Sequence, residues 1–161
     1  AWCEDAWLST AMLSQVSARL KFLVAFRPGL VSPFLAAQMA GTFQNLTGGR
    51  LLLNVVTGGE SHEQRMFGDF LDKDARYARC AEFLHVVRAL WRGETVTFHG
   101  EHLQVEDATL DQIPDPRTRR RSIDAGCLDR TDDLDDDLAT GGRGRHARIR
   151  LTLVAGRLGT R

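Results

Sequence analysis

The spacing of apolar residues changes several times along the first hundred positions, and each change predicts a new element. A helical period follows Asp5, which can cap a helix, and it ends near Ser17. Its apolar members are Trp7, Leu8, Ala11, Met12 and Val16. Residues 20–26 are almost continuously apolar and predict a strand, which the sequence Arg27-Pro28-Gly29 ends.

The first strand is followed by a second predicted helix and a second strand. Ser32 can cap this helix, and Pro33 suits its first position because no backbone N–H is needed there. Its apolar face comprises Leu35, Ala36, Met39, Ala40, Phe43 and Leu46. After a glycine end at Gly48 or Gly49, residues 51–57 are apolar on both faces, as in a buried parallel strand. Strand, helix and strand within about 38 residues fit a right-handed parallel crossover.

A third helix and a hairpin complete the patterned part of the chain. A loop that contains Gly68 leads to a predicted helix over residues 74–91, which Gly93 ends. One side of this helix carries Tyr77, Cys80, Leu84, Val87 and Trp91. Residues 94–99 and 102–105 alternate polar with apolar positions and predict a hairpin. Helices that alternate with apolar strands predict an α/β domain, here part of an open sheet or of an eight-stranded barrel.

Residues 117–161 have a different composition from the rest of the chain. All eight Phe, all three Trp and the single Tyr lie at or before Phe98, and the tail has neither Lys nor Pro. It holds eleven Arg and seven Asp, so it carries a formal charge of +4, against −4 for residues 1–116. Low apolar content with blocks of like charge predicts a disordered extension or the product of a shifted reading frame. We therefore expect residues 117–161 to pack little against residues 1–110.

Cysteine, histidine and hydropathy patterns argue against several classes of protein. The three cysteines are odd in number and lack C-x-x-C spacing, and no histidine or carboxylate spacing predicts a metal site. The chain has no signal peptide and no apolar run near 18 residues, so we expect a cytoplasmic protein that does not enter a membrane. The basic block at residues 117–121 lacks an aromatic platform, so nucleic-acid binding is not expected. A first residue other than Met, directly before a helix start, suggests a fragment.

Several separated blocks between residues 3 and 105 occur in one order and register that point to a single family. The blocks are Cys3-Glu4-Asp5-Ala6-Trp7, residues 19–28, residues 49–58, Phe70-Leu71-Asp72, Ala75-Arg76-Tyr77, Glu82-Phe83 and residues 86–105. Together they resemble the bacterial luciferase-like flavin monooxygenases, with the FMNH2-dependent alkanesulfonate monooxygenases as the closest branch. The resemblance covers about residues 1–110. It implies a (β/α)8 TIM barrel, with this chain running from the second helix through the fourth helix and the hairpin after it.

The resemblance also implies an activity. Family members bind reduced FMN at the C-terminal face of the barrel and use O2 to cleave the C–S bond of an alkanesulfonate, which releases an aldehyde and sulfite. A separate NAD(P)H-dependent flavin reductase supplies the reduced FMN, in agreement with the lack of a G-x-G-x-x-G loop in this chain. A homo-oligomer is implied for the full-length protein.

The candidate cofactor ligands follow the second strand and the start of the third helix. Asn54 and Thr57 occupy the exit of an apolar strand, where polar groups can bond a flavin ring, and Gly58 lets the backbone approach closely. The alternative is that Asn54 satisfies a neighbouring backbone group and Thr57 only ends the strand. Family members bring a tyrosine near the flavin at the Ala-Arg-Tyr block, which implies this role for Tyr77, with helix packing as the alternative.

Two further residues are candidates for catalysis and for substrate binding. The resemblance matches Cys3 to the active-site cysteine of the sulfonatase branch, whereas a lone cysteine can also be a small buried apolar residue. We expect Cys80 and Cys127 to be small buried apolar residues. Arg27 follows the first strand and can bind a sulfonate or phosphate through paired N–H donors, or it can simply face solvent.

The likeness to the family stops after the hairpin. Family members continue with a fifth strand and with later arginine and histidine ligands, which have no counterparts in the tail of this chain. We therefore expect an incomplete enzyme that is inactive by itself. The alternative from another class is a non-catalytic remnant or assembly module whose exposed sheet edges bind a partner.

Overall fold

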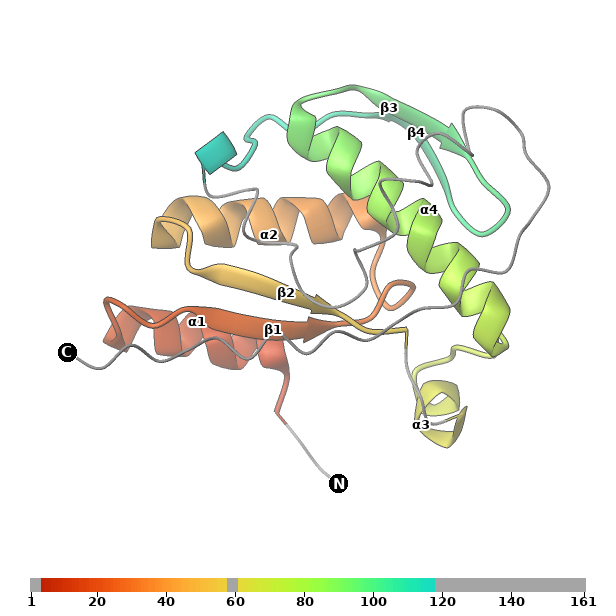
Figure 1. The fold of residues 1–161 in the computed structure, drawn as a ribbon, viewed down its shortest axis with the longest axis horizontal. Helices are drawn as coiled ribbons and strands as arrows, with labels where there is room; N and C mark the ends of the chain where they lie inside the picture. Colours follow the sequence, from red (N-terminus) through yellow and green to blue (C-terminus); the bar gives the residue numbers. More distant parts are fainter. Residues whose placement is uncertain (1–3, 58–60, 118–161) are drawn as a thin grey trace, which may run out of the picture.

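The computed structural model describes residues 4–57 and 61–117, and these form helices packed on strands (Figure 1). The elements are α1 (Ala6–Val16), β1 (Phe22–Phe26), α2 (Pro33–Thr47), β2 (Leu51–Val55), α3 (Ser61–Met66), α4 (Lys73–Arg92), β3 (Val96–His99) and β4 (Gln104–Ala108). β1 pairs with β2 in parallel, and β3 pairs with β4 antiparallel. The predicted α/β class with two parallel core strands and a hairpin is confirmed. The described part is an open section of a barrel and does not close.

Capping residues explain where the helices begin and end. The side chains of Asp5, Ser32 and Asp72 each accept a hydrogen bond from a backbone N–H three residues later, at 2.8, 3.1 and 2.9 Å. At their other ends, α2 and α4 stop at Gly48 (φ 65°) and Gly93 (φ 85°) in the left-handed conformation. All five positions were predicted as helix boundaries or lie within two residues of them.

Several features differ from the sequence prediction. β1 begins at Phe22 and not at Leu20, and the segment after β2 contains the short helix α3 where a loop was predicted. In α1 the predicted apolar side is exposed, with Met12 at 74% and Val16 at 83%. Periodicity identified the helix but not the side that contacts the rest of the described chain.

The position of α1 has a specific cause. Its end is held by the Arg50 guanidinium, which donates to the backbone oxygens of Ser14 and Ser17. Near its start, the Trp7 ring meets the Phe26 ring edge to face at 6.1 Å. These contacts turn Thr10 and Ser14 inward and leave the leucine and methionine side outward.

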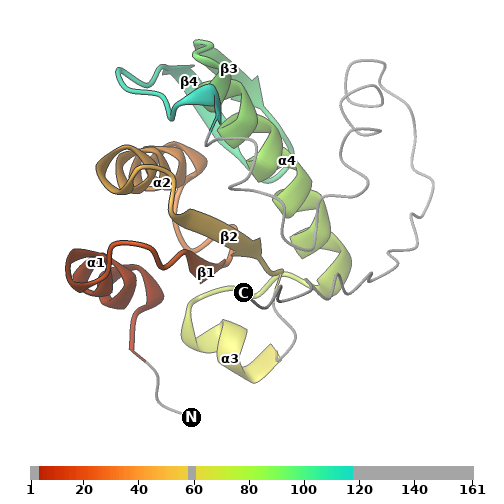
Figure 2. The same ribbon diagram turned by 60° about the vertical axis from the view of Figure 1, so that its left-hand side comes forward.

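The core lies on one face of the parallel sheet, beneath α2 and α4 (Figures 1 and 2). β2 sends Leu51, Leu53 and Val55 to this covered face, and β1 sends Val24 and Phe26. Trp91 and Phe83 of α4 are the largest buried side chains, and the Trp91 indole N–H donates to the Ala37 carbonyl of α2 at 3.0 Å. The buried amide of Gln44 pairs with both backbone groups of Leu51, at 3.2 and 3.0 Å.

The opposite face of the same sheet is open among the described residues. Leu23 is 59% exposed, Ala25 is exposed, and Leu52, Asn54 and Val56 are half-buried. The expectation that β2 is covered on both faces is therefore wrong for residues 4–57 and 61–117. In a closed barrel this face would line the interior.

The hairpin is attached to α4 through a buried carboxylate. Glu82 accepts backbone hydrogen bonds from Glu101, His102 and Leu103 at 2.9–3.0 Å, so one side chain fixes the turn between β3 and β4. After the hairpin, residues 110–114 still pack on α2, where Pro114 is buried. Residues 118–161 of the predicted tail lie outside the described residues, and the boundary at residue 110 stays a prediction.

Candidate functional site

The candidate site is the C-terminal edge of the parallel strands. Arg27 directly follows β1, and Val56 and Thr57 directly follow β2. The short helix α3 and the beginning of α4 lie beyond the arrowheads of the two strands (Figure 1). In α/β barrels this edge carries the ligand site, because the strand ends deliver side chains from several elements to one place.

Asn54 and Thr57 lie at the end of β2, and Asn54 is on the open face. Asn54 is opposite Ala25 of β1 in the register and is half-buried. Among the described residues, neither the Asn54 amide nor the Thr57 hydroxyl has a hydrogen-bond partner. The Val56 N–H donates to Phe26 at 2.9 Å, so the strand pairing continues up to the edge. This geometry leaves both side chains able to bond a ligand.

Arg27 is held by α3. Its Nη2 donates to the Glu63 carboxylate at 2.8 Å, and its guanidinium carbon lies 5.6 Å from the centre of the Phe67 ring. The Arg27 side chain is 24% exposed and that of Glu63 is 48% exposed. The simple alternative of a solvent-facing arginine therefore does not describe this residue, although no ligand role follows from the ion pair itself.

The other predicted site residues are only partly brought to the same edge. Tyr77 is half-buried near the start of α4, with the Lys73 ammonium 6.0 Å from its ring centre. Cys3 and Gly58 lie outside the described residues. Cys80, assigned a packing role from the sequence, is buried in α4.

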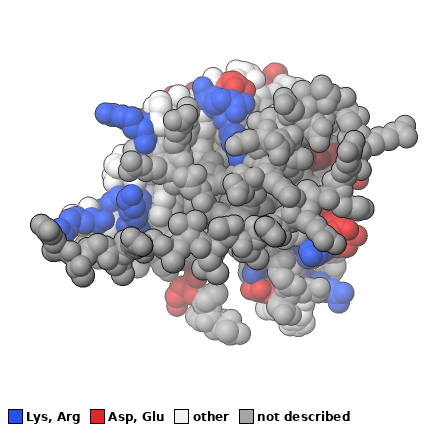
Figure 3. Space-filling view, in the orientation of Figure 1, with Lys and Arg blue, Asp and Glu red and all other residues white. Residues whose placement is uncertain are grey.

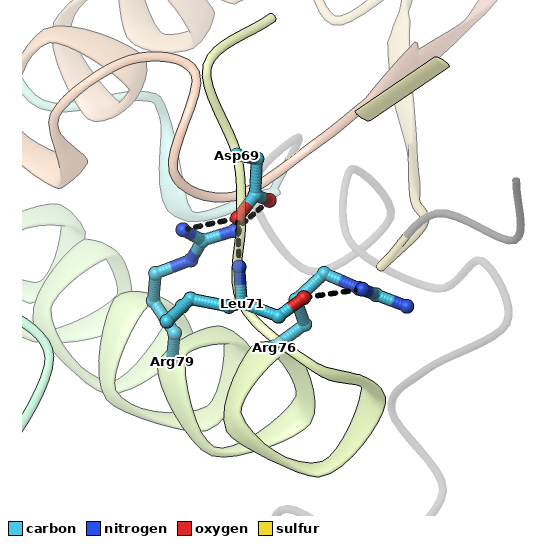
Figure 4. A network of polar contacts seen from close by, with 4 residues as sticks. All are labelled: Asp69, Leu71, Arg76 and Arg79. Atoms are coloured by element: carbon cyan, nitrogen blue, oxygen red, sulfur yellow. Dashed lines mark hydrogen bonds and ion pairs between the residues drawn. The ribbon is translucent and has the colours of Figure 1, made fainter. Parts of the chain in front are cut away.

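A charged network at this edge was not predicted from the sequence. Arg79 of α4 donates to both carboxylate oxygens of Asp69, at 3.3 and 2.5 Å, and the Leu71 N–H donates to Asp69 at 3.3 Å (Figure 4). Arg76 donates to the Leu71 carbonyl at 2.6 Å. The ion pair is buried, with side chains 12% and 9% exposed. Burial alone raises the pKa of Asp69, but these hydrogen bonds and the charges of Arg79 and Arg76 hold that pKa below its ordinary value.

The same network reaches the loop after β1. Gly29 has a φ of +98°, and a Cβ there would lie 2.2 Å from the Arg79 guanidinium carbon. Glycine thus lets the arginine pack directly on the loop backbone. The pairing escaped prediction because Asp69 and Arg79 are ten positions apart and on different elements, but the Pro28-Gly29 sequence was a usable signal of close backbone approach.

The charges around the site are mixed in sign. In the space-filling view, acidic and basic side chains lie beside each other around α3 at the lower right (Figure 3). Across residues 4–57 and 61–117, no three His, Cys, Asp or Glu side chains gather as they would around a metal ion. Over the same residues, no helix is both long and apolar enough to cross a membrane.

Comparisons with known proteins agree with this architecture. The chain is similar to EDTA monooxygenase from Chelativorans sp. BNC1, with 21% identity and a TM-score of 0.63 over 71% of this chain and 33% of that one. A riboflavin lyase solved with modified FMN gives 19% identity and a TM-score of 0.65 over 71% and 31%. An F420-dependent secondary alcohol dehydrogenase has 24% sequence identity to this chain. Its TM-score is 0.63 over 71% of this chain and 36% of that one. The chain thus spans about one third of the length of these structures.

At these identities the three structures show a shared fold and nothing finer. The family assignment comes from a sequence model for luciferase-like monooxygenases, which matches residues 1–131. This match covers most of the chain and includes every predicted site residue. The predicted resemblance is therefore confirmed at the level of the family, whose members act on small molecules. The chain belongs to the luciferase-like monooxygenase family of oxidoreductases.

Proposed function

We propose that this chain is part of a flavin-dependent monooxygenase that cleaves the C–S bond of alkanesulfonates to an aldehyde and sulfite. Family membership supports a monooxygenase, and the blocks shared with the alkanesulfonate branch support the substrate. The observation that carries the proposal is the polar exit of β2. There, Asn54 and Thr57 have no hydrogen-bond partner among the described residues, and Asn54 lies on the sheet face that a barrel would enclose.

Reduced FMN is the proposed cofactor, supplied by an NAD(P)H-dependent reductase, and when bound it supplies the activation of O2. Among the similar structures, one contains modified FMN and another depends on F420. Of these two cofactors, the sequence blocks of this chain favour FMN. Asn54 offers both a donor and an acceptor to the polar edge of a flavin ring, and Thr57 offers a hydroxyl. Gly58 allows close approach of the backbone, and Tyr77 borders the site from α4.

Arg27 and Cys3 complete the proposed set. Arg27 is assigned to the sulfonate, because it directly follows β1 at the C-terminal edge and its guanidinium can donate in parallel to two oxygens. Cys3 is assigned a catalytic contact with the cofactor through its match to the active-site cysteine. In this proposal, groups from the ends of two strands contact the cofactor and the sulfonate.

The site needs more strands than the described part contains. The chain covers about a third of each similar barrel, and only β1 and β2 of its described strands are parallel. We expect turnover only when further strand–helix units close the barrel, and we propose a cytoplasmic homo-oligomer for the complete enzyme. The rival function, a non-catalytic assembly module, is favoured by the exposure of Leu23 and the α1 side chains.

Sulfite release distinguishes the two functions. Residues 1–117 would replace the matching third of an alkanesulfonate monooxygenase barrel, and the chimera would be assayed with octanesulfonate, O2 and enzymatically reduced FMN. Sulfite formation that is lost on Asn54→Ala substitution supports the proposal. A chimera that folds by circular dichroism and assembles, yet binds no reduced FMN in an anaerobic titration, supports the assembly module.

A further inference from the structure

Unpartnered buried polar atoms concentrate at one place in the described part of the chain. Five such side-chain atoms occur: Arg27 Nη1, Gln64 Nε2, Gln64 Oε1, Arg76 Nε and Arg79 Nε. All belong to the C-terminal edge of the parallel sheet, on the loop after β1, on α3 and at the start of α4. Four are N–H donors and one is an acceptor. A buried polar atom without a partner is unfavourable, so a cluster of them calls for an explanation.

Gln64 is the most distinctive member of this cluster. The residue is 3% exposed, and within the described part of the chain neither polar atom of its amide has a partner. Each arginine of the cluster makes another bond: Arg27 to Glu63, Arg76 to the Leu71 carbonyl and Arg79 to Asp69. Sequence periodicity had placed this segment in a loop and gave no role to Gln64.

Arg27 contacts the short helix that carries Gln64. Phe67 continues the last turn, since its N–H donates to the Gln64 carbonyl at 3.0 Å. Residues three and four apart share a helix face, so Phe67 is bordered by both Glu63 and Gln64. Arg27 lies over Phe67 and bonds Glu63, so its guanidinium contacts α3, the helix that carries Gln64.

The chemistry of the cluster fits an oxyanion. Donors outnumber acceptors by four to one among the unpartnered atoms, and the three guanidinium groups face only two ion-paired carboxylates, Glu63 and Asp69. A sulfonate or phosphate has several acceptor oxygens, which match the excess of donors, and a negative charge, which matches the excess of guanidinium groups over carboxylates. A cation or an apolar group would satisfy neither.

We propose that Gln64 and Arg27 form a recognition site for an oxyanion, in which Gln64 Nε2 and Arg27 Nη1 both donate to its oxygens. The proposal rests on the proposed function in placing the ligand at this edge, and it names Gln64 as a residue that determines binding of the anionic group. Glu63 competes with the ligand for Arg27. Because its side chain is 48% exposed, this ion pair is weak and can be exchanged.

Two substitutions with opposite expected effects test the site. Gln64→Leu removes both unpartnered atoms at similar volume, so the melting temperature of the ligand-free chain should rise by about 4 °C. The same variant should lose the stabilisation that methanesulfonate or inorganic phosphate gives to the parent chain, measured against chloride at equal ionic strength. Glu63→Gln should instead tighten the apparent anion affinity about two- to fivefold by releasing Arg27.

The matched control is Gln38→Leu, at an exposed position of α2, which should change neither property. A lower melting temperature for Gln64→Leu, or an unchanged response to both anions, would overturn the proposal. A stronger response to methanesulfonate than to phosphate assigns the site to the substrate, and the reverse assigns it to the cofactor. If the anions still stabilise the chain but reduced FMN does not bind, the proposed function is contradicted and the oxyanion site is supported.

Discussion

The two faces of the β1–β2 sheet differ in burial, although both are formed mainly by apolar residues. The covered face buries Leu51, Leu53 and Val55 beneath α2 and α4, whereas the other face leaves Leu23 59% exposed and Asn54 half-buried. Burial in the described chain is therefore on one face, and the Asn54 amide, without a partner among the described residues, lies on the other. A face that lacks packing here is available to whatever closes the barrel and to a ligand at its edge.

The largest expected effect comes from truncating the same side chain on the two faces. Leu51→Ala removes a fully buried leucine and should lower the free energy of unfolding by about 3 kcal/mol. Leu23→Ala, on the open face of the neighbouring strand, should cost less than about 1 kcal/mol. Urea unfolding followed by tryptophan fluorescence measures both. Equal losses would mean that the open face is packed and that the comparison fails.

The second prediction concerns the polar anchor of the covered face. Gln44→Leu leaves both the N–H and the carbonyl of Leu51 without their side-chain partner in a buried position, so we expect a loss of about 2 kcal/mol. Gln38→Leu on the exposed side of the same helix is the control and should be nearly neutral. If the two variants unfold at the same urea concentration, the amide contributes nothing to the attachment of β2.

The third prediction concerns the C-terminal edge of the sheet, where the two faces meet. Asp69 at this edge should make the stability of the chain depend on pH. Its pKa is held below 3.8, so the contribution of the Asp69–Arg79 pair to stability is complete above about pH 4 and is lost as the pH falls through the lowered pKa. Asp69→Asn should destabilise the chain at pH 7, because Arg79 loses its buried partner, and this difference should shrink towards pH 2.

The comparison requires unfolding curves at several pH values, with Asp111→Asn as the control at an exposed carboxylate. A destabilisation by Asp69→Asn that is constant from pH 7 to pH 2 would contradict the assigned charge state of Asp69.

Local signals predicted most of the fold, but not the orientation of its parts. Caps at Asp5 and Ser32 and the glycine ends of α2 and α4 act over three or four residues, so the sequence shows them directly. Leu52 and Leu53 are identical residues on opposite faces of β2, and only the position of α2 and α4 decides which one is buried.

The same distinction applies to the site. Asn54 and Thr57 were predicted at the edge because they end an apolar strand. The Asp69–Arg79 pair and the burial of Gln64 arise from contacts between elements, which residue spacing does not report. Cys3 and Gly58 lie outside the described residues, so their predicted roles stay predictions.

The smallest expected effect on stability belongs to the residue with the clearest proposed role. Asn54→Ala should change the free energy of unfolding by no more than about 0.5 kcal/mol, because its amide bonds no described residue and the open face gives it little packing. In a completed barrel the same substitution should weaken binding of reduced FMN by about 1–3 kcal/mol, since a desolvated ring atom loses its partner.

Thr57→Ala should behave like Asn54→Ala, whereas Arg27→Ala should cost only about 0–1 kcal/mol of flavin affinity because its charge is already paired with Glu63. Anaerobic titration of the three variants, beside their urea unfolding curves, separates affinity from stability. If Arg27→Ala weakens FMN more than Asn54→Ala does, the cofactor contacts belong to the loop after β1. The end of β2 would then be a structural feature of the open face and not its ligand site.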